Sequence, residues 1–325
     1  MSSLISVNNL TRRYGDFCAV NNISFELAAG DILGFLGPNG AGKTSTMQML
    51  TGNLAPTFGE ISINGIDLLE NPKAAKASLG YLPENPPLYK EMTVTEYLHY
   101  CARLHLINRQ HINKVCDSAI ERCGLGDVRQ RLINNLSKGY QQRVGIAQAI
   151  LHSPPVIILD EPTVGLDPIQ ILEIRNLVKT LGETQGIILC THILPEVQAV
   201  CNRVQIINQG VIVYSANMDD VLSRQNTKFE ITLSSNISAE KLAGHDAFKS
   251  IEIIDDFSFT AESDLSADKL SEYIVKQQWG LTRFTTYQTS LEQIFIDLTL
   301  TETSTQETDA RETKVEGDSI EENAA

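Results

Sequence analysis

The 325-residue chain carries a formal net charge of −14 at pH 7, from 26 Lys and Arg against 40 Asp and Glu residues. This acidic balance argues against a nucleic-acid partner, because a phosphate backbone is bound by an excess of cationic side chains. The composition, with 42% hydrophobic and 20% charged residues, is that of a globular protein long enough for one large domain or two ordinary ones.

The sequence predicts neither a membrane span nor a secretory signal. No run approaches the roughly 18 apolar residues that a span requires, and residues 1–7 lack a basic stretch followed by an apolar one. The six cysteines form no C-x-x-C pair, and we interpret them as buried free thiols in a reducing compartment. These features predict a cytoplasmic protein.

The first 65 residues predict a small antiparallel sheet. Residues 4–7 and 23–27 alternate between apolar and polar side chains, as strands do, on either side of a turn that begins at Tyr14. A third short strand is predicted at 60–65. An aromatic residue on such a turn is usually a half-buried packing residue, so this segment alone does not indicate a function for Tyr14.

Residues 37–44 read GPNGAGKT and fit the P-loop pattern G-x-x-x-x-G-K-[ST]. A short apolar strand is predicted before them, at 31–36, and a helix after them, at 45–52, which is the context that the motif needs. Glycines allow the loop to turn its N–H groups toward a polyphosphate. Lys43 would then reach the terminal phosphates and the Thr44 hydroxyl would hold Mg²⁺. The motif predicts a nucleoside triphosphate site.

A helical block of about residues 85–150 interrupts the predicted α/β core. A strand at 79–82 runs into a proline-rich loop that contains Glu84, and helices are predicted at 93–106 and 112–123. Thr93 and Glu96 have capping-box spacing. A further helix is predicted at 144–151. Ser137 and Gly139 lie at or near a helix start, and the plain structural alternative is that Ser137 is simply the N-cap of a helix.

Two adjacent carboxylates end a continuous apolar strand at 155–159, which is typical of a buried parallel strand. Asp160 could hold Mg²⁺ through water, and Glu161 could orient or deprotonate a water for attack on a phosphate. The alternative is an ordinary acidic turn. The next apolar strand, 186–190, leads to Thr191 and His192. A doubly wound sheet would bring His192 to the same edge as the carboxylates.

Chemistry-bearing motifs stop after about residue 224. Strands at 229–233, 251–254 and 257–260 and helices at 267–277 and 291–298 predict a small α+β domain. From residue 301 the chain is polar and acidic, which predicts a disordered tail. The predicted domains are 1–225, 226–300 and the tail 301–325.

With these motifs in order, the sequence resembles the ATP-binding subunit of an ABC transporter. Residues 136–143, LSKGYQQR, resemble the family signature, residues 165–167 its D-loop, and His192 its switch histidine. The stretches 80–84 and 290–295 resemble the ABC-2 exporter type, closest to gliding-motility ATPase-like subunits. The resemblance implies an α/β fold: a P-loop NTPase core (ABC ATPase) with an antiparallel β subdomain, an inserted helical subdomain and a small C-terminal α+β domain.

The resemblance also implies roles for individual residues, with ATP and Mg²⁺ as cofactors. Catalysis of ATP hydrolysis would fall to Glu161 as general base, with His192 and Lys43. Mg²⁺ would be held by Thr44, Glu84 and, through water, Asp160. The nucleotide-binding residues would be Tyr14, which would stack on adenine, Gly37, Pro38, Asn39, Gly40, Ala41, Gly42, Lys43, Thr44, Ser45, Glu84, Ser137, Gly139, Asp160 and Asp167.

The sequence departs from the family pattern at three of its motif positions. Glu84 stands where the family most often has Gln, and Lys138 and Tyr140 stand where Gly and Gln are commonest. Ser137 and Gly139, the members that face phosphate, are retained.

In the family, one subunit does not complete its own site. Ser137 and Gly139 would contact ATP held by a second copy, in a head-to-tail dimer with two-fold symmetry. ATP-driven dimerisation would power a separate membrane permease, docked beside the Glu84 loop and the helices at 93–123. The chain would then lie in the cytoplasm as a peripheral protein on the inner face of the cell membrane.

The alternative function is a soluble ABC ATPase acting on a ribosome or DNA complex. Ribosome-acting members resemble two such cassettes in tandem, whereas this chain has one set of motifs. DNA-repair members carry long coiled coils or zinc hooks, and neither heptads nor C-x-x-C occurs here. A nucleotide kinase would have no use for the signature stretch.

Overall fold

We describe the protein from a computed structural model over residues 3–224, 228–234, 245, 247–287 and 291–300. The chain divides into two compact units, Met1–Ala216 and Asn217–Ala325, which we describe separately. The predicted disordered tail, 301–325, lies outside the described residues, and the predicted boundaries at 225 and 300 stay predictions.

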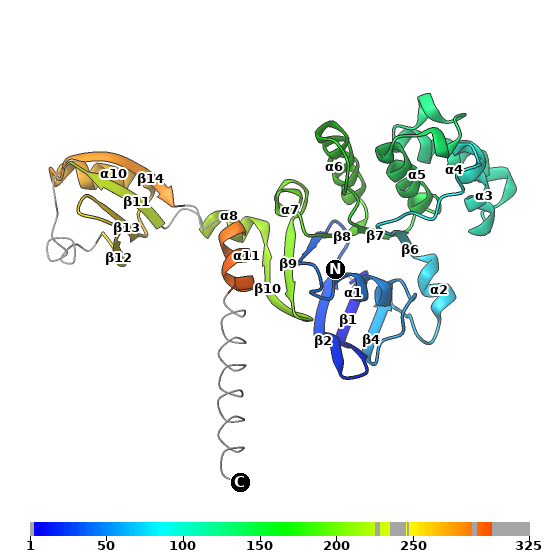
Figure 1. Ribbon diagram of the computed structural model, residues 1–325, viewed down its shortest axis with the longest axis horizontal. Coiled ribbons are helices and arrows are strands. Elements are labelled where there is room, and N and C mark those ends of the chain that lie inside the picture. The colour runs from blue at the N-terminus through cyan, green and yellow to red at the C-terminus, as the bar shows by residue number, and fades with distance from the viewer. Residues whose placement is uncertain (1–2, 225–227, 235–244, 246, 288–290, 301–325) are drawn as a thin grey trace, which may run out of the picture. The chain divides into compact units, whose positions relative to one another are not determined.

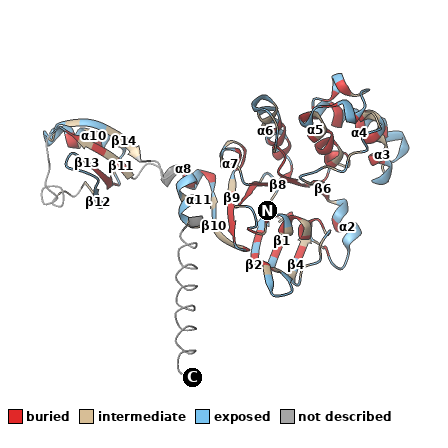
Figure 2. Ribbon diagram, viewed as in Figure 1, coloured by how far each residue is buried: buried red, intermediate tan, exposed pale blue. Residues whose placement is uncertain are grey.

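The first unit is built on a six-stranded sheet with the order β10-β9-β3-β8-β7-β6. Neighbouring strands from β6 to β9 are parallel, so the carboxyl ends of β3, β7 and β8 meet at one edge (Figure 1). Residues of β3, β7 and β8 are buried throughout, as continuous apolar runs require; Figure 2 colours the chain by burial and labels β8 among these strands. The strands are β3 (Ile32–Leu36), β6 (Leu79–Leu82), β7 (Val156–Asp160), β8 (Gly186–Thr191), β9 (Arg203–Asn208) and β10 (Val211–Asn217).

The predicted antiparallel sheet is present, with the order β2-β1-β4-β5. Its strands are β1 (Ile5–Tyr14), β2 (Phe17–Leu27), β4 (Phe58–Ile63) and β5 (Ile66–Asp67). β1 and β2 are longer than the sequence predicted. Their pairing contains register shifts, and Asn9 and Asn22 have positive φ angles of 49° and 53°. These irregularities break the apolar alternation on which the prediction depended.

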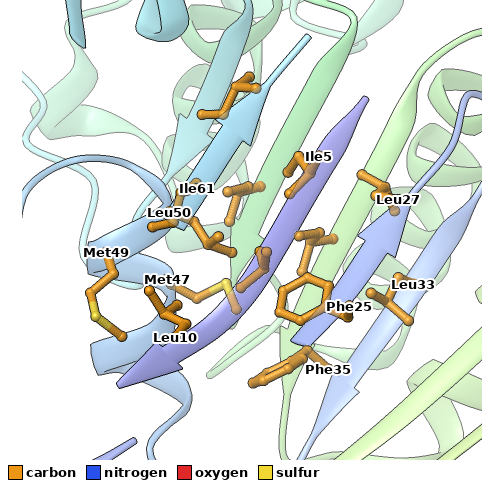
Figure 3. Close-up of a cluster of buried hydrophobic side chains, with 14 of the residues drawn as sticks. Ile5, Leu10, Phe25, Leu27, Leu33, Phe35, Met47, Met49, Leu50 and Ile61 are labelled. Atoms are coloured by element: carbon orange, nitrogen blue, oxygen red, sulfur yellow. The ribbon is translucent and has the colours of Figure 1, made fainter. Parts of the chain in front are cut away.

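One hydrophobic core joins this sheet to a face of the parallel sheet, with α1 (Lys43–Leu50) among its contributors. The rings of Phe25 and Phe35 pack with their centroids 5.9 Å apart. Figure 3 labels part of this core: Ile5, Leu10, Phe25, Leu27, Leu33, Phe35, Met47, Met49, Leu50 and Ile61. The P-loop is therefore held between two sheets that share one core.

The remaining helices of the first unit fall into two groups, apart from α2. α6 (Pro168–Gly182) contacts β8, and α7 (Leu194–Val200) contacts β3 and β8. The inserted helical subdomain contains α3 (Val94–Leu104), α4 (Arg109–Arg122), α5 (Lys138–Ile150) and the short 3-10 helices η1 (Gly126–Val128) and η2 (Ile133–Asn135). The helix α2 (Pro72–Ala77), which the sequence did not predict, contacts β4, β5 and β6.

The capping box predicted for α3 is confirmed. The Thr93 hydroxyl accepts from the Glu96 N–H, and the Glu96 carboxylate accepts from the Thr93 N–H at 2.8 Å. Gly124 follows α4 with a φ of 63°, the left-handed conformation that ends many helices.

The second unit is the predicted small α+β domain. It has a sheet of order β12-β13-β11-β14, and α10 covers it with Leu270 and Ile274, which are fully buried. The elements are α8 (Met218–Arg224), β11 (Lys228–Leu233), β12 (Ser250–Ile253), β13 (Ser258–Glu262), α10 (Ala267–Lys276), β14 (Leu281–Tyr287) and α11 (Leu291–Leu300). The sequence did not predict β14, because its large side chains at 281, 284 and 287 are spaced by three, not two.

None of the helices in the described part of the chain is both long and apolar enough to cross a bilayer.

A stacked pair of histidines joins the helical subdomain to the parallel sheet. The ring centroids of His105, which follows α3, and His152, which follows α5, are 4.1 Å apart with an interplanar angle of 13°. His152 Nε2 donates to the Leu79 carbonyl oxygen at the start of β6 (3.1 Å). Burial and the neighbouring His105 lower the pKa of His152 to about 4, and burial lowers the pKa of His105.

These histidines predict an acid-sensitive stability. His152 takes up a proton near its ordinary pKa of 6.5 when unfolded but only near 4 when folded. The contribution of neutral His152 to the free energy of unfolding is therefore fully present above pH 6.5 and is lost as the pH falls toward 4. Denaturant unfolding at pH 7.5 and pH 5 should show a smaller loss of stability in His152→Gln than in the wild type. The exposed His111→Gln should behave like the wild type, and an equal loss in all three proteins would contradict the prediction.

Candidate functional site

A cavity of about 380 Å³ opens where the carboxyl ends of the parallel strands face the turn between β1 and β2. It draws on segments far apart in the sequence, as the parallel topology predicts. Its lining residues are Tyr14, Phe17, Ala19, Asn39, Gly40, Gly42, Lys43, Thr44, Ser45, Glu84, Glu161, Val164 and His192. The structure thus brings together most of the site residues that the sequence predicted.

The P-loop places the ammonium group of Lys43 at the base of this cavity. Lys43 is only 7% exposed, and its Nζ donates to the carbonyl oxygens of Gly37 (2.8 Å) and Pro38 (3.1 Å). Gly42 precedes α1 with a φ of 105°, and a Cβ there would collide with the Ala19 carbonyl oxygen. The loop backbone therefore requires glycine at this position.

Glu161 has a constrained backbone and a well-oriented carboxylate. Its φ of 48° is unusual for a residue with a side chain, and its N–H donates to the Cys190 carbonyl oxygen (2.9 Å). The Glu161 carboxylate is oriented by His192, whose Nδ1 lies 2.8 Å from Oε1. An imidazole that donates from Nδ1 to a carboxylate is held in one tautomer.

Behind Glu161 lies a second carboxylate, Glu196 of α7, which is 1% exposed. Thr163 donates its hydroxyl to Glu196 Oε1, and the Thr191 hydroxyl oxygen lies 3.1 Å from Glu196 Oε2. Burial raises the pKa of Glu196, and the two threonine hydroxyls and Arg175 oppose the rise.

Asp160 lies beside these groups, at the end of β7, and is 3% exposed. Burial is the largest cause of its raised pKa, a hydrogen bond with Cys190 opposes it, and the carboxylates of Glu161 and Glu84 add to it. Lys43 offsets only part of this negative charge.

Oxygen donors of this kind fit Mg²⁺. Asp160, Glu84 and the Thr44 hydroxyl are hard ligands in a region with excess negative charge. The described residues contain no cluster of three or more His, Cys, Asp or Glu side chains that could hold a metal alone. Mg²⁺ itself is usually held by one or two carboxylates, with substrate phosphates and water completing its coordination shell.

Three predicted site residues lie away from the cavity. Ser137 is the N-cap of α5 and accepts from the Tyr140 N–H (3.4 Å). Asp167 is the N-cap of α6 and accepts from the N–H groups of residues 169 and 170. Gly139 packs against the Gln170 side chain, with no room for a Cβ. The starts of α5 and α6 therefore adjoin, on a surface separate from the cavity. Gly37, Pro38, Ala41 and Asp160 are close to the cavity but do not line it.

Tyr14 and Phe17 form an aromatic rim, paired across the β1–β2 turn. Tyr14 is 45% and Phe17 64% exposed, and the Arg12 guanidinium carbon lies 4.5 Å from the centre of the Tyr14 ring. Sequence reasoning missed Phe17, although an aromatic residue on each side of Gly15 and Asp16 was a usable signal.

Sequence reasoning also missed Ala19, Val164 and Glu196. Ala19 and Val164 are small apolar residues without a distinguishing pattern. Glu196 stands in the first turn of a helix, where acidic residues are common, so only the fold reveals that it is buried.

A glycine loop between a strand and a helix, with a buried lysine and a strand-end acidic pair across the cavity, defines a P-loop nucleoside triphosphatase. Comparisons with known proteins narrow this class. Residues 20–164 match the family model for ABC transporter. The bacitracin transport ATP-binding protein BcrA of Bacillus licheniformis is 34% identical over 302 residues, which are 92% of this chain and 98% of that protein.

Two further comparisons agree. The uncharacterised ABC transporter ATP-binding protein YxlF of Bacillus subtilis is 35% identical over 74% of this chain and 79% of that protein. A solved structure of an ATP-binding subunit of an ABC transporter superposes with a TM-score of 0.62 at 30% identity, over 68% of this chain and 93% of that one. The chain belongs to the ABC transporter family, as an ATP-binding subunit, and as such it binds and hydrolyses ATP.

The glycines of the loop provide a graded test of the nucleotide site. Gly42→Ala introduces both a strained φ and a collision with the Ala19 carbonyl, so ATP binding measured by titration calorimetry should become at least about 100-fold weaker. Gly40 also has a positive φ, 83°, but open space around its Cβ position. Gly40→Ala should therefore introduce only the backbone strain, about 1–2 kcal/mol, and should weaken ATP binding less than Gly42→Ala does. Equal losses in both variants would show that the collision does not matter.

Proposed function

We propose that this chain is the ATP-hydrolysing subunit of an ABC-2 type exporter. Two copies close head-to-tail around two ATP molecules, and this closure drives a separate membrane permease. The observation that carries the proposal is the division of the motif residues between two surfaces. Lys43, Glu161 and His192 line the cavity, whereas Ser137, which is exposed, and Gly139, which the Gln170 side chain covers, lie away from it at the start of α5.

The cavity supports a specific assignment of binding roles. The aromatic rim of Tyr14 and Phe17 would take the adenine ring. The N–H groups of the loop, from Gly37 to Ser45, would surround the phosphates, helped by the positive end of α1. Lys43 would exchange its bonds to the loop carbonyls for bonds to phosphate oxygens.

Magnesium would be held by Thr44, Asp160 through water, and Glu84. When bound, the cation would neutralise charge on the phosphates and on the leaving oxygen. Glu84 brings a negative charge where the family most often has a neutral Gln, and this charge adds to the demand for a cation.

Hydrolysis would depend on Glu161 as general base. It would accept a proton from the attacking water while His192 fixes the orientation of its carboxylate and contacts the γ-phosphate. Ser137 and Gly139 of the second copy would present the N-terminus of α5 to the same phosphate. Loss of the γ-phosphate would then remove the contact that holds the two copies together.

The permease would dock in a groove between the core and the helical subdomain. A cavity of about 610 Å³ lies there, beside the Glu84 loop. Its lining includes Pro83 and Pro87 of that loop, His105 after α3, and Lys76 of α2. Docked in this way, the chain would lie as a peripheral protein on the inner face of the membrane. BcrA is named as a bacitracin transport protein, which supports a transport role.

The mechanism predicts that Glu161→Gln separates ATP binding from hydrolysis. The amide cannot accept the proton of the attacking water, so turnover should fall at least about 100-fold while ATP binding persists. ATP would then hold the two copies closed, and the variant should elute as a dimer in size-exclusion chromatography with ATP and as a monomer without it. Adding Ser137→Arg should abolish this dimer. Turnover at the wild-type rate would exclude Glu161 as the base.

Co-purification from detergent-solubilised membranes tests the partner. The wild type should retain a protein with several membrane spans. Pro87→Arg, in the groove, should lose it, whereas Glu26→Arg, on an exposed position of β2 away from the groove and from the helices at 93–123, should retain it. Recovery of ribosomes in place of a membrane protein would favour the alternative function.

A further inference from the structure

The Thr191 hydroxyl lies between two carboxylates and has one proton to donate. Its oxygen is 3.1 Å from Glu196 Oε2 and 3.3 Å from Glu161 Oε2. The same oxygen accepts from the Ile193 N–H at 3.1 Å. A hydroxyl donates a single hydrogen bond, so Glu161 and Glu196 compete for it.

Glu196 is the favoured acceptor of the Thr191 hydrogen bond. It is buried, and its other oxygen, Oε1, already accepts from Thr163. A buried carboxylate needs hydrogen bonds on both oxygens to offset its desolvation. Glu161, in contrast, lines the cavity and can find a donor in water.

The carboxylate to which Thr191 donates determines whether Oε2 of Glu161 is available to the attacking water. Its Oε1 accepts from His192. If Thr191 donates to Glu196, then Glu161 Oε2 has no protein donor among the contacts described and is left for the attacking water. If Thr191 donates to Glu161 instead, each Glu161 oxygen already accepts a protein hydrogen bond, so fewer lone pairs remain for the attacking water and the carboxylate is a weaker base.

We infer that Glu196 is a positioning residue for hydrolysis: it draws the Thr191 proton away from Glu161 and so keeps one Glu161 oxygen free for the attacking water. This inference rests on the proposed role of Glu161 as general base. The charged and titratable groups around Glu196 are Arg175 on α6, Glu161 after β7 and Cys201 after α7, and only Glu161 shares a hydroxyl with it.

The decisive variant is Glu196→Gln, because an amide nitrogen in place of Oε2 would donate to the Thr191 oxygen. The Thr191 hydroxyl would then donate to Glu161 Oε2 and compete there with the attacking water. We expect kcat for ATP to fall on the order of tenfold, with KM and the dissociation constant for ATP unchanged. The exposed Glu183→Gln, at the end of α6, is the matched control and should keep the wild-type kcat.

A second substitution separates this role from a structural one. Thr191→Val is close in shape and removes the proton for which the carboxylates compete. In the Thr191→Val background, Glu196→Gln should change kcat less than threefold, because no hydroxyl remains to block Glu161. A purely structural Glu196 would give the same loss of kcat with either residue at position 191, and that result would overturn the inference.

Glu161→Gln in the same assay separates the two levels of the argument. If it turns over at the wild-type rate, the proposed function of Glu161 fails, and the inference about Glu196 fails with it. If Glu161→Gln is inactive while Glu196→Gln matches the wild type, only the inference about Glu196 is overturned. Thermal unfolding of every variant identifies those whose loss of kcat reflects a loss of fold.

Discussion

The site depends on the alignment of β8 between β3 and β7. Parallel pairing places Leu36, the last residue of β3, beside Thr191, and Asp160, the last residue of β7, beside Cys190. This register brings the start of the P-loop, the acidic pair and His192 to one edge of the sheet. Because a one-residue shift in a strand reverses the face of every side chain, the buried apolar residues of β8 fix the chemistry as firmly as the motif residues do.

The charge at this edge is consistent with the proposal that a second copy completes the site. Glu161 and Glu84 each interact unfavourably with Asp160, and Lys43 opposes them. A triphosphate would add more negative charge. A divalent cation and the N-terminus of a second helix, besides that of α1, would supply further positive potential. The start of α5, capped by Ser137, is a helix N-terminus on another surface, which favours its use by a second copy.

The motif residues were predictable because their spacing has a physical meaning. A glycine loop before a helix, and carboxylates at the end of an apolar strand, each imply their local geometry, and the structure places Gly42, Lys43, Thr44 and Glu161 around one cavity. The α/β core, the antiparallel sheet and the helical insertion were predictable for the same reason. Irregular or weakly periodic elements were not: β1 runs through bulges, and the large side chains of β14 recur at every third position.

Glu196 marks the limit of sequence reasoning, because its position in the chain suggests a solvent-exposed helix start. Only the packing of α7 against β3 and β8 buries it behind Glu161. Burial of a carboxylate costs several kcal/mol unless hydrogen bonds compensate. A neutral side chain would bind two threonine hydroxyls without that cost, but it would not hold the Thr191 proton as strongly as a charged acceptor does. The unfavourable burial of Glu196 is thus understandable as the condition for leaving Glu161 one free oxygen.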